Sequence, residues 1–398
     1  MSGPPPLAGI TVLDFSRVLA APMATQVLAE LGATVLKVER PGGGDETRGF
    51  EPRLPHGESA YFFAFNRGKR SVTLDLKNPR GQEIARRLAA RADVVVENFL
   101  PGTMDRLGLG YAALAAANPA LVYISATGFG QSGPDRDRKG YDTIFQALSG
   151  VMAMTGAPDG PPAKAGVPIA DLASGLWVLI AVLTGLAGRA TSGRGRHLDV
   201  AMMDVQLSLQ ALNAARLFAL DEDPVRTGTE HPGRVPSAAF RAADGGWLHI
   251  SCSDQHWDPL CAVLGLDELA AEPALRSNAG RVAERDRVMR ALTDAIGARE
   301  RDGLVKELRG AEVPVGEVRG VREALTDPHA VARGVVAEFE HPTEGSFPAL
   351  RTPLREAGGD PPEVGSPPLL GADTDTVLAE LAGLTPAEID DLRVEGVV

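Results

Sequence analysis

One aspartate in this sequence stands where a carboxylate could do covalent chemistry. Asp171 directly precedes a long uncharged apolar run, Leu172–Gly188, and lies within the segment GVPIADLASG at positions 166–175. We expect the run to be helical, with Asp171 at its N-terminus, where free backbone N–H groups and the helix dipole favour the ionised carboxylate. Such a group is either a helix N-cap or a nucleophile. Both roles need the same charged carboxylate, so the position alone does not separate them.

The residue patterns of other common catalytic sites are missing from the sequence. The seven histidines show no His-Glu-x-x-His spacing, and neither Gly-x-Ser-x-Gly nor a P-loop occurs. The two cysteines, Cys252 and Cys261, are too few for a disulfide framework or a four-ligand zinc site. We therefore expect no metal, no bound cofactor and a reducing, cytoplasmic location.

The first 40 residues follow the outline of a dinucleotide-binding unit but lack its key turn. A strand over Ile10–Phe15 is followed by a helix and a second strand, Thr34–Glu39, whose terminal acid could hold a ribose. A dinucleotide site also needs glycines directly after the first strand, so that the backbone can approach the pyrophosphate. The turn Ser16–Pro22 contains no glycine, and Gly42–Gly44 come only after the second strand. A nicotinamide cofactor is therefore not expected.

The alternation of strands and helices continues beyond this opening. The pattern predicts strands at Val72–Leu76, Val94–Glu97 and Leu121–Ala126, with a helix at Arg80–Arg91. Strands that alternate with helices indicate a parallel sheet covered on both faces. The expected fold class is therefore α/β, a doubly wound, Rossmann-like sheet.

The chain is long enough for a second domain. At 398 residues it exceeds the usual size of one domain. Residues 206–236 are predicted to form a linker, because prolines and glycines gather towards their end. A smaller domain of residues 237–326 is expected to be inserted, which leaves residues 1–205 and 327–398 as the large domain.

The N-terminus and the apolar run do not indicate a secreted or membrane protein. The first residues, MSGPPP, have neither a basic region nor an apolar core, so no signal peptide is expected. The run Leu172–Gly188 is at the lower edge of a bilayer span, and no second such run occurs. We expect a buried core or interface helix rather than a membrane anchor.

The charge is acidic overall but unevenly distributed. The formal net charge is −12, whereas nucleic-acid-binding proteins normally carry a basic surface, so nucleic acid is not an expected partner. Residues 1–140 nevertheless contain 17 Lys and Arg against 14 Asp and Glu. The remaining 258 residues contain 23 against 38. The first third is therefore mildly basic.

Several ordered motifs make the sequence resemble the class III CoA-transferase family, which includes formyl-CoA transferases, carnitine CoA-transferases and α-methylacyl-CoA racemases. The motifs are VLDFSRVLAAP (12–22), LGA (31–33), VERP (38–41), GDETR (44–48), VENF (96–99), GFGQSGP (128–134), GYD (140–142) and the Asp171 segment. The resemblance runs from about Leu7 to the C-terminus. It also implies an interlocked homodimer.

The resemblance assigns Asp171 as the nucleophile. It implies attack of the carboxylate on an acyl-CoA thioester, giving an acyl-aspartyl anhydride and CoA thiolate, and then an aspartyl-CoA thioester that passes CoA to an incoming carboxylic acid. Covalent catalysis of this kind divides one difficult exchange into easier steps. The thioester is conserved throughout, so the resemblance requires no ATP or metal, and acyl-CoA is a substrate.

The resemblance also places CoA along the large domain. Positions that approach the phosphates and adenine of CoA in the family correspond here to four cations: Arg40, Lys77, Arg106 and Lys139. Asn98 and Phe99 match positions that line the CoA path. Several cations that converge on one polyanion suit phosphate binding, although each alone could be a solvated surface charge.

Within the family, the sequence favours transfer between dicarboxylic acids. The racemases carry a proton-shuttling His where this chain has Tyr141, and a phenol is a poor shuttle at neutral pH. Tyr141 is instead expected to bind substrate. Formyl-CoA:oxalate enzymes carry Gln where this chain has Leu19, and their glycine-rich loop is replaced by Ser251–His256. The closer likeness is to succinyl-CoA:glutarate CoA-transferases, with the oxalate and carnitine types as alternatives and a racemase less expected.

Two arginines are candidates for the distal carboxylate of a dicarboxylic acid. Arg17 and Arg48 each offer a guanidinium fork that matches a carboxylate. The alternative for Arg17 is a structural ion pair with Asp14 or Glu39, and the sequence leaves both possibilities open.

Overall fold

The computed structural model describes residues 4–359 and 361–398 of the chain. The chain divides into two compact units. The first comprises Met1–Val151, Ala165–Asp221 and Pro328–Val398, and the second comprises Met152–Lys164 and Glu222–Asp327. Residues 206–221, predicted in a linker, instead belong to the first unit, where they complete helix α9 (Met202–Ser208) and form α10 (Ala211–Leu220). These residues contain no proline or glycine that would prevent a helix.

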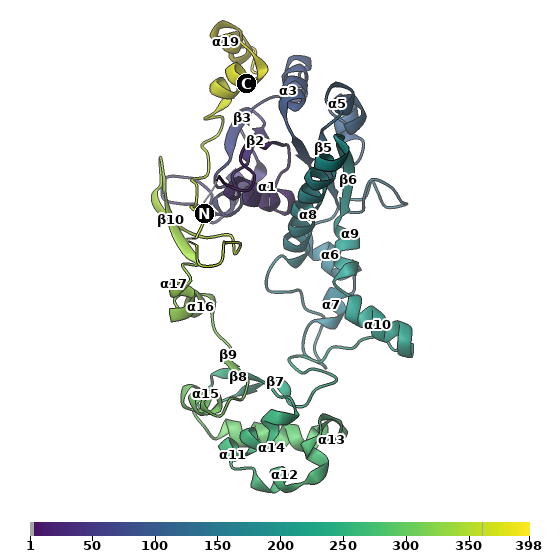
Figure 1. Ribbon diagram of the computed structural model, residues 1–398, viewed down its shortest axis with the longest axis vertical. Coiled ribbons are helices and arrows are strands. Elements are labelled where there is room, and N and C mark those ends of the chain that lie inside the picture. The colour runs from purple at the N-terminus through teal and green to yellow at the C-terminus, as the bar shows by residue number, and fades with distance from the viewer. Residues whose placement is uncertain (1–3, 360) are drawn as a thin grey trace. The chain divides into compact units, whose positions relative to one another are not determined.

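The first unit is built on a parallel sheet with the strand order β3-β2-β1-β4-β5-β6 (Figure 1). The strands are β1 (Thr11–Asp14), β2 (Thr34–Glu39), β3 (Arg70–Thr73), β4 (Val94–Glu97), β5 (Val122–Thr127) and β6 (Arg196–Ala201). Each neighbouring pair runs parallel. The chain order reverses between β1 and β4, the place where ligands bind in open α/β sheets. The predicted doubly wound α/β class is confirmed.

Apolar side chains on both faces of the sheet explain why helices cover both faces. Successive strand residues point to opposite faces. Leu13 and Val95 face one layer, and their neighbours Val12 and Val94 face the other. The first layer contains α3 (Pro79–Arg91), α5 (Tyr111–Ala117), α18 (Thr374–Ala382) and α19 (Pro386–Val394). The second contains α1 (Ala20–Glu30), α8 (Ile169–Ser192) and α9.

Helix α8 has one buried side and one exposed apolar side. Among the described residues it is the one helix long and apolar enough to cross a membrane. Its residues Val178 and Val182 are fully buried in the core against the sheet. Leu176, Trp177 and Ile180 remain about half exposed on the other side. The core position of α8 agrees with the predicted core helix.

The second unit has its own sheet and core. Its antiparallel sheet has the order β7-β8-β9, from Ser237–Arg241, Trp247–Ser251 and Val315–Glu317. The helices α11 (Trp257–Leu264), α14 (Arg285–Gly297) and α15 (Arg301–Gly310) bury Trp257 and Leu292 against it. Cys252 and Cys261 are buried in this core, where burial raises the pKa of each thiol to about 12.

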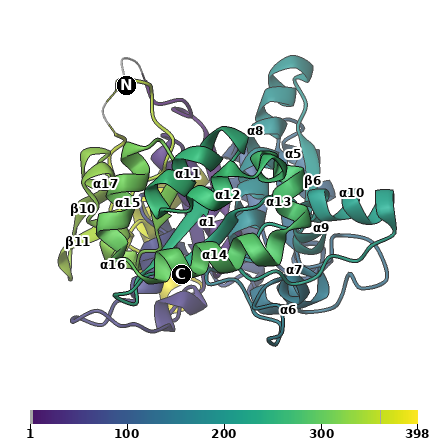
Figure 2. The same cartoon turned by 90° about the horizontal axis from the view of Figure 1, so that it is seen from below.

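The end of the chain returns to the first unit. Strands β10 (Val336–His341) and β11 (Gly345–Leu350) form an antiparallel hairpin that lies beside α17 (Pro328–Ala332) (Figures 1 and 2). Phe339 of the hairpin packs against Phe63 of α2 (Ala60–Phe65).

Candidate active site

Asp171 lies in the first turn of α8, but it is not the N-cap. The N-cap is Pro168, and Asp171 is the third residue of the helix. The carboxylate that caps α8 comes from Asp142, the first residue of α6 (Asp142–Leu148). Its Oδ1 accepts the backbone N–H groups of Ala170 and Asp171 at 2.8 and 3.3 Å. The side chain of Asp171 is therefore not needed to cap its own helix.

The carboxylate of Asp171 is held in a setting that disfavours its charge. Burial, together with the negative charge of Asp142, raises the pKa of Asp171 to about 7. No described residue donates a hydrogen bond to this carboxylate. The helix dipole favours the opposite direction, but burial of the carboxylate outweighs it, and Asp142 takes two of the free N–H groups and adds a like charge.

Asp142 is in turn fixed by a neighbour on its own helix. The Nε2 of Gln146 donates to Asp142 Oδ2 at 2.7 Å, and the Oε1 of Gln146 accepts the N–H of Ala165 at 2.8 Å. Gln146 is fully buried. The sequence did not reveal the role of Asp142, because nothing local shows that α6 meets the start of α8.

Tyr61 is a second residue near Asp171 that the sequence did not reveal. It lies on α2, and burial with the charges of Asp171, Asp142 and Asp45 raises its pKa to about 12. The phenol is therefore protonated at neutral pH. Its surrounding sequence, AYFFAF, resembles a core helix and carries no chemical pattern.

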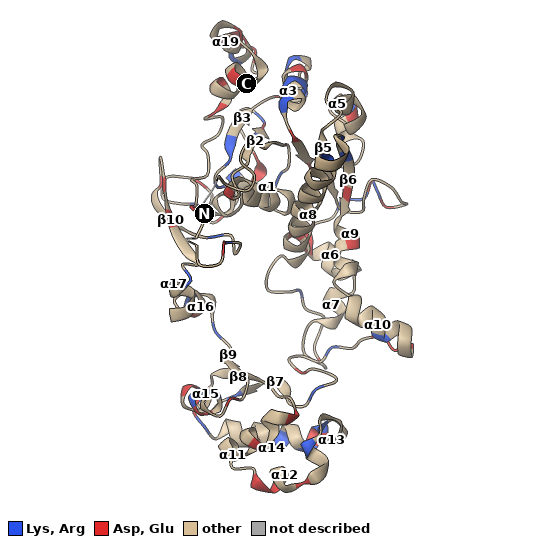
Figure 3. Ribbon diagram, viewed as in Figure 1, with Lys and Arg blue, Asp and Glu red and all other residues tan. Residues whose placement is uncertain are grey.

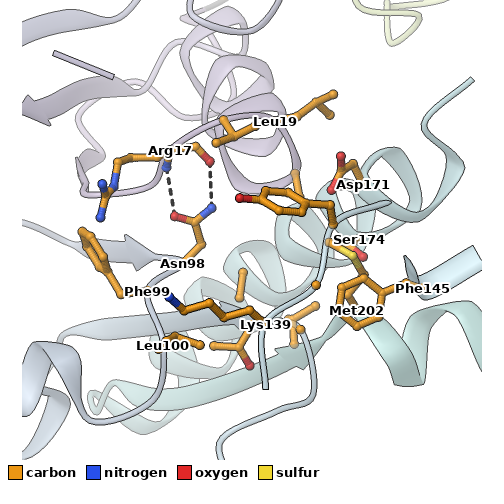
Figure 4. A pocket seen from close by; sticks show the side chains of 18 of the residues that line it. Arg17, Leu19, Asn98, Phe99, Leu100, Lys139, Phe145, Asp171, Ser174 and Met202 are labelled. Atoms are coloured by element: carbon orange, nitrogen blue, oxygen red, sulfur yellow. Dashed lines mark hydrogen bonds between the residues drawn. The ribbon is translucent and has the colours of Figure 1, made fainter. Parts of the chain in front are cut away.

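Asp171 faces a cavity of about 260 Å³ at the point where the strand order reverses. Arg17, Val18 and Leu19, which follow β1, line one side, and Asn98 and Phe99, which follow β4, line another (Figure 4). The remaining predicted members of the cavity wall are Lys139 and Tyr141, and the side chain of Tyr141 is 77% exposed. Tertiary structure thus brings five of the predicted site residues together with Asp171.

Arg17 is available to a ligand in this cavity. Its guanidinium lies over the ring of Phe99, 4.4 Å from the centroid, and its ion pair with Glu46 is long at 3.4 Å and exposed. The open alternative, a structural pair with Asp14 or Glu39, does not occur. Asp14 pairs with Lys69 at 3.1 Å, and Glu39 pairs with Arg48.

Arg48 does not line the cavity. Its Nε and Nη2 donate to the two oxygens of Glu39 at 2.7 and 2.8 Å, and its Nη1 lies 3.9 Å from an oxygen of Glu58. Nη2 also reaches the carbonyl of Pro368, and the guanidinium lies 3.7 Å from the centroid of the Phe62 ring. The side chain is 9% exposed. This geometry favours a structural role over the predicted contact with substrate.

The four cations predicted for CoA phosphates share one property. Arg40, Lys77, Arg106 and Lys139 are exposed, and none forms an ion pair with a residue the structure describes. Arg40 directly follows β2, and Lys77 lies between β3 and α3. Lys139 lines the cavity, whereas the other three lie outside its wall. Figure 3 shows further Lys and Arg residues on α3. Unpaired cations that follow the carboxyl ends of strands suit an anionic ligand.

Fold and site together describe an α/β protein in which a buried carboxylate faces a cavity that cations also line. Residues 7–374 match the family model of CoA-transferase family III, and the chain belongs to this family. It is 39% identical over 384 residues to the succinate–glutarate CoA-transferase of Agrobacterium fabrum, covering 95% of this chain and 96% of that protein. It is 37% identical over 360 residues to the acetyl-CoA:oxalate CoA-transferase of Acetobacter aceti, covering 90% of each. The predicted family and enzyme class are confirmed.

A solved structure supports the fold over the whole chain. A CAIB/BAIF family protein from Brucella suis matches with a TM-score of 0.84 at 39% identity, covering 95% of this chain and 100% of that one.

Proposed function

We propose that this protein moves CoA from succinyl-CoA, or another dicarboxylyl-CoA, to a carboxylic acid acceptor through a thioester on Asp171. The observation that carries the proposal is the Asp171 carboxylate, which faces the cavity without a hydrogen-bond donor and with a pKa of about 7. The similarity to a succinate–glutarate CoA-transferase supports this choice of substrates.

Each step of the proposed exchange uses the same carboxylate. Asp171 attacks the thioester carbonyl, and CoA leaves as the thiolate, which gives an acyl-aspartyl anhydride. The thiolate then attacks the aspartyl carbonyl and releases the donor acid, which leaves an aspartyl-CoA thioester. The acceptor carboxylate repeats the two steps in reverse, and the enzyme regains its free carboxylate. We place the CoA phosphates along Arg40, Lys77, Arg106 and Lys139, and Tyr141 beside the acyl group.

The direct test is transfer between defined acids. Incubation with succinyl-CoA and glutarate is expected to give glutaryl-CoA and succinate, read by mass spectrometry of the CoA esters. A panel should include oxalate, carnitine and monocarboxylic acids, because an oxalate-type relative is nearly as similar. Transfer only to oxalate would replace the proposed substrates. Absence of transfer to every acid would contradict the proposal, and exchange of the α-proton in deuterated water would favour a racemase.

The rate of thioester formation on Asp171 is expected to rise with pH and level off above about 7. The reason is that burial and Asp142 raise the pKa of Asp171 to about 7, and only the ionised carboxylate attacks. Single-turnover quenching at a series of pH values, with intact-mass detection of the CoA adduct, measures this profile. Asp142→Asn keeps an oxygen to cap α8 but removes the charge, so its profile should shift to lower pH. An identical profile in both proteins would show that Asp142 does not influence the nucleophile.

Arg17→Ala is expected to raise the KM for a dicarboxylic acceptor by about 10- to 100-fold, the range for loss of a charge-assisted hydrogen-bonded pair. The KM for a monocarboxylic acceptor of equal chain length should change little, since it lacks the distal charge. Arg53→Ala, on an exposed loop side chain, is the control. An equal rise in the KM for both acceptors would mean that Arg17 does not bind the distal carboxylate.

We further propose that the chain forms the interlocked homodimer that its resemblance implies. The exposed stripe of Leu176, Trp177 and Ile180 on α8 supports a protein partner on this surface. Light scattering coupled to size exclusion measures the mass, and a monomer at micromolar concentration would contradict this proposal.

A further inference from the structure

The turn between β1 and α1 holds a backbone conformation that its sequence does not favour. Val18 has a φ of 69°, in the left-handed region, although it is β-branched and has no glycine-like freedom. Strained residues of this kind persist only where the surroundings hold them, and they cluster at functional sites. The turn carries Arg17, so whatever holds Val18 also sets the position of that arginine.

Asn98 holds the residue before Val18 through both ends of its side-chain amide. The N–H of Arg17 donates to Asn98 Oδ1 at 2.9 Å, and Asn98 Nδ2 donates to the carbonyl of Arg17 at 2.8 Å (Figure 4). The two residues are 81 positions apart in the chain and meet because β1 and β4 are neighbours in the sheet. Asn98 uses its acceptor and one donor on a single residue.

A buried ion pair holds the turn from the other side. Asp45 accepts the N–H of Val18 at 3.3 and 3.4 Å, and Lys37 donates to Asp45 at 2.8 Å. Lys37 also donates to the carbonyl of Ser16 at 3.0 Å. The side chains of Lys37 and Asp45 are fully buried. The turn is thus fixed on both sides of Arg17.

The guanidinium of Arg17 rests on the residue that follows Asn98. Phe99 presents its ring to the guanidinium at 4.4 Å, and the N–H of Phe99 donates to Glu97 at 2.9 Å, which steadies the segment. Asn98 and Phe99 therefore act on one arginine, the first on its backbone and the second on its side chain.

We propose that Asn98 is a positioning residue that holds the Arg17–Val18 turn so that the Arg17 guanidinium meets the distal carboxylate of the acyl group. This inference rests on the proposed function and gives Asn98 a role other than lining the CoA path. It makes the choice of dicarboxylic acids depend on a residue that need not touch them.

The test separates a role in acyl selection from a role in CoA binding. Asn98→Leu removes both hydrogen bonds at similar volume, and the KM for glutarate is expected to rise about 5- to 30-fold, the range for two lost hydrogen bonds. The KM for a monocarboxylic acceptor and the Kd for free CoA should stay within about twofold, because neither ligand carries a distal carboxylate. In an Arg17→Ala background, Asn98→Leu should have little further effect on glutarate, because its target is gone.

Two further variants provide a second test of the inference and a matched control. Phe99→Leu removes the ring below the guanidinium without adding polarity and should shift the same KM in the same direction, even if Asn98→Leu folds poorly. Asn118→Leu is the matched control, since Asn118 also makes two side-chain bonds to backbone carbonyls, those of Ala89 and Ala92, outside the cavity. Its ratio of glutarate to monocarboxylate KM should equal that of the wild type.

The outcomes distinguish this inference from the proposed function. If the wild type transfers CoA to glutarate while Asn98→Leu and Phe99→Leu alter only the Kd for free CoA, the inference is overturned and the function stands. Additive effects of Arg17→Ala and Asn98→Leu on glutarate would also overturn it. If the wild type transfers CoA to no dicarboxylic acid, both the proposed function and this inference are contradicted.

Discussion

An Asp171→Ala enzyme is expected to lose at least about 10³-fold of its CoA-transfer rate, because removal of a covalent nucleophile removes the reaction path itself. No other carboxylate in the cavity wall can replace it among the described residues, since the wall contains one acid. The cations that we place along CoA are unchanged in the variant, so CoA should still bind. Transfer is measured by mass spectrometry of CoA esters, and binding by calorimetry.

Detection of the CoA thioester on the protein provides a second test of Asp171 as the nucleophile. The wild type, quenched in acid after mixing with succinyl-CoA, should carry CoA as a thioester, and Asp171→Ala should carry none. Asp267→Ala is the matched control, because Asp267 also lies in the first turn of a helix, α12 (Asp267–Ala271), and is exposed. Retained turnover in Asp171→Ala would show that the nucleophile is another residue.

Arg48→Ala is expected to lower the free energy of unfolding by about 3–5 kcal/mol, the range for removing one partner of a buried ion pair. The reason is that Glu39 would remain buried without its bidentate partner, and the cation on the Phe62 ring would be lost as well. The partners of Glu39 hold its pKa below the ordinary value against the opposing effect of burial, and Arg48 contributes to this by a hydrogen bond and by its charge. Urea denaturation followed by circular dichroism measures the loss.

A surface arginine gives the comparison for Arg48. Arg80 pairs with Glu395, and both side chains are nearly half exposed, so Arg80→Ala should cost about 0–1 kcal/mol. If Arg48→Ala instead unfolds like the wild type and raises the KM for glutarate, then Arg48 binds substrate, as the sequence suggested, and the structural role fails.

Much of the fold was predictable because its signals are local. The central strands β1, β4 and β5 are short segments rich in apolar and β-branched residues, and turns and helices separate them from one another along the chain. Parallel strands joined by helices allow few arrangements, so the doubly wound class followed from the pattern. The predicted linker was wrong for residues 206–221, which form the end of α9 and the whole of α10. Their place in the first unit depends on contacts between segments distant in the sequence.

The candidate site likewise contains residues that the sequence indicates and contacts that only the fold reveals. Asp171 could be identified from the sequence, because an acid before a long apolar run and a set of ordered motifs are both visible in one dimension. The same local pattern led to the wrong direction for its pKa. Asp142 lies 29 positions earlier and meets α8 only in the folded chain, where it takes the backbone N–H groups that would otherwise favour the charge of Asp171.

The two arginines show most clearly what the sequence determined and what the tertiary structure decided. The sequence indicated both Arg17 and Arg48 as candidates, because each carries a guanidinium fork that matches a carboxylate. Only the fold shows that Glu39 takes the fork of Arg48, whereas Asn98 and Phe99 hold Arg17 at the cavity. The physical reason is that residue type and spacing determine what a side chain can bind. Which partner it meets depends on contacts between distant segments, and these exist only once the sheet has formed.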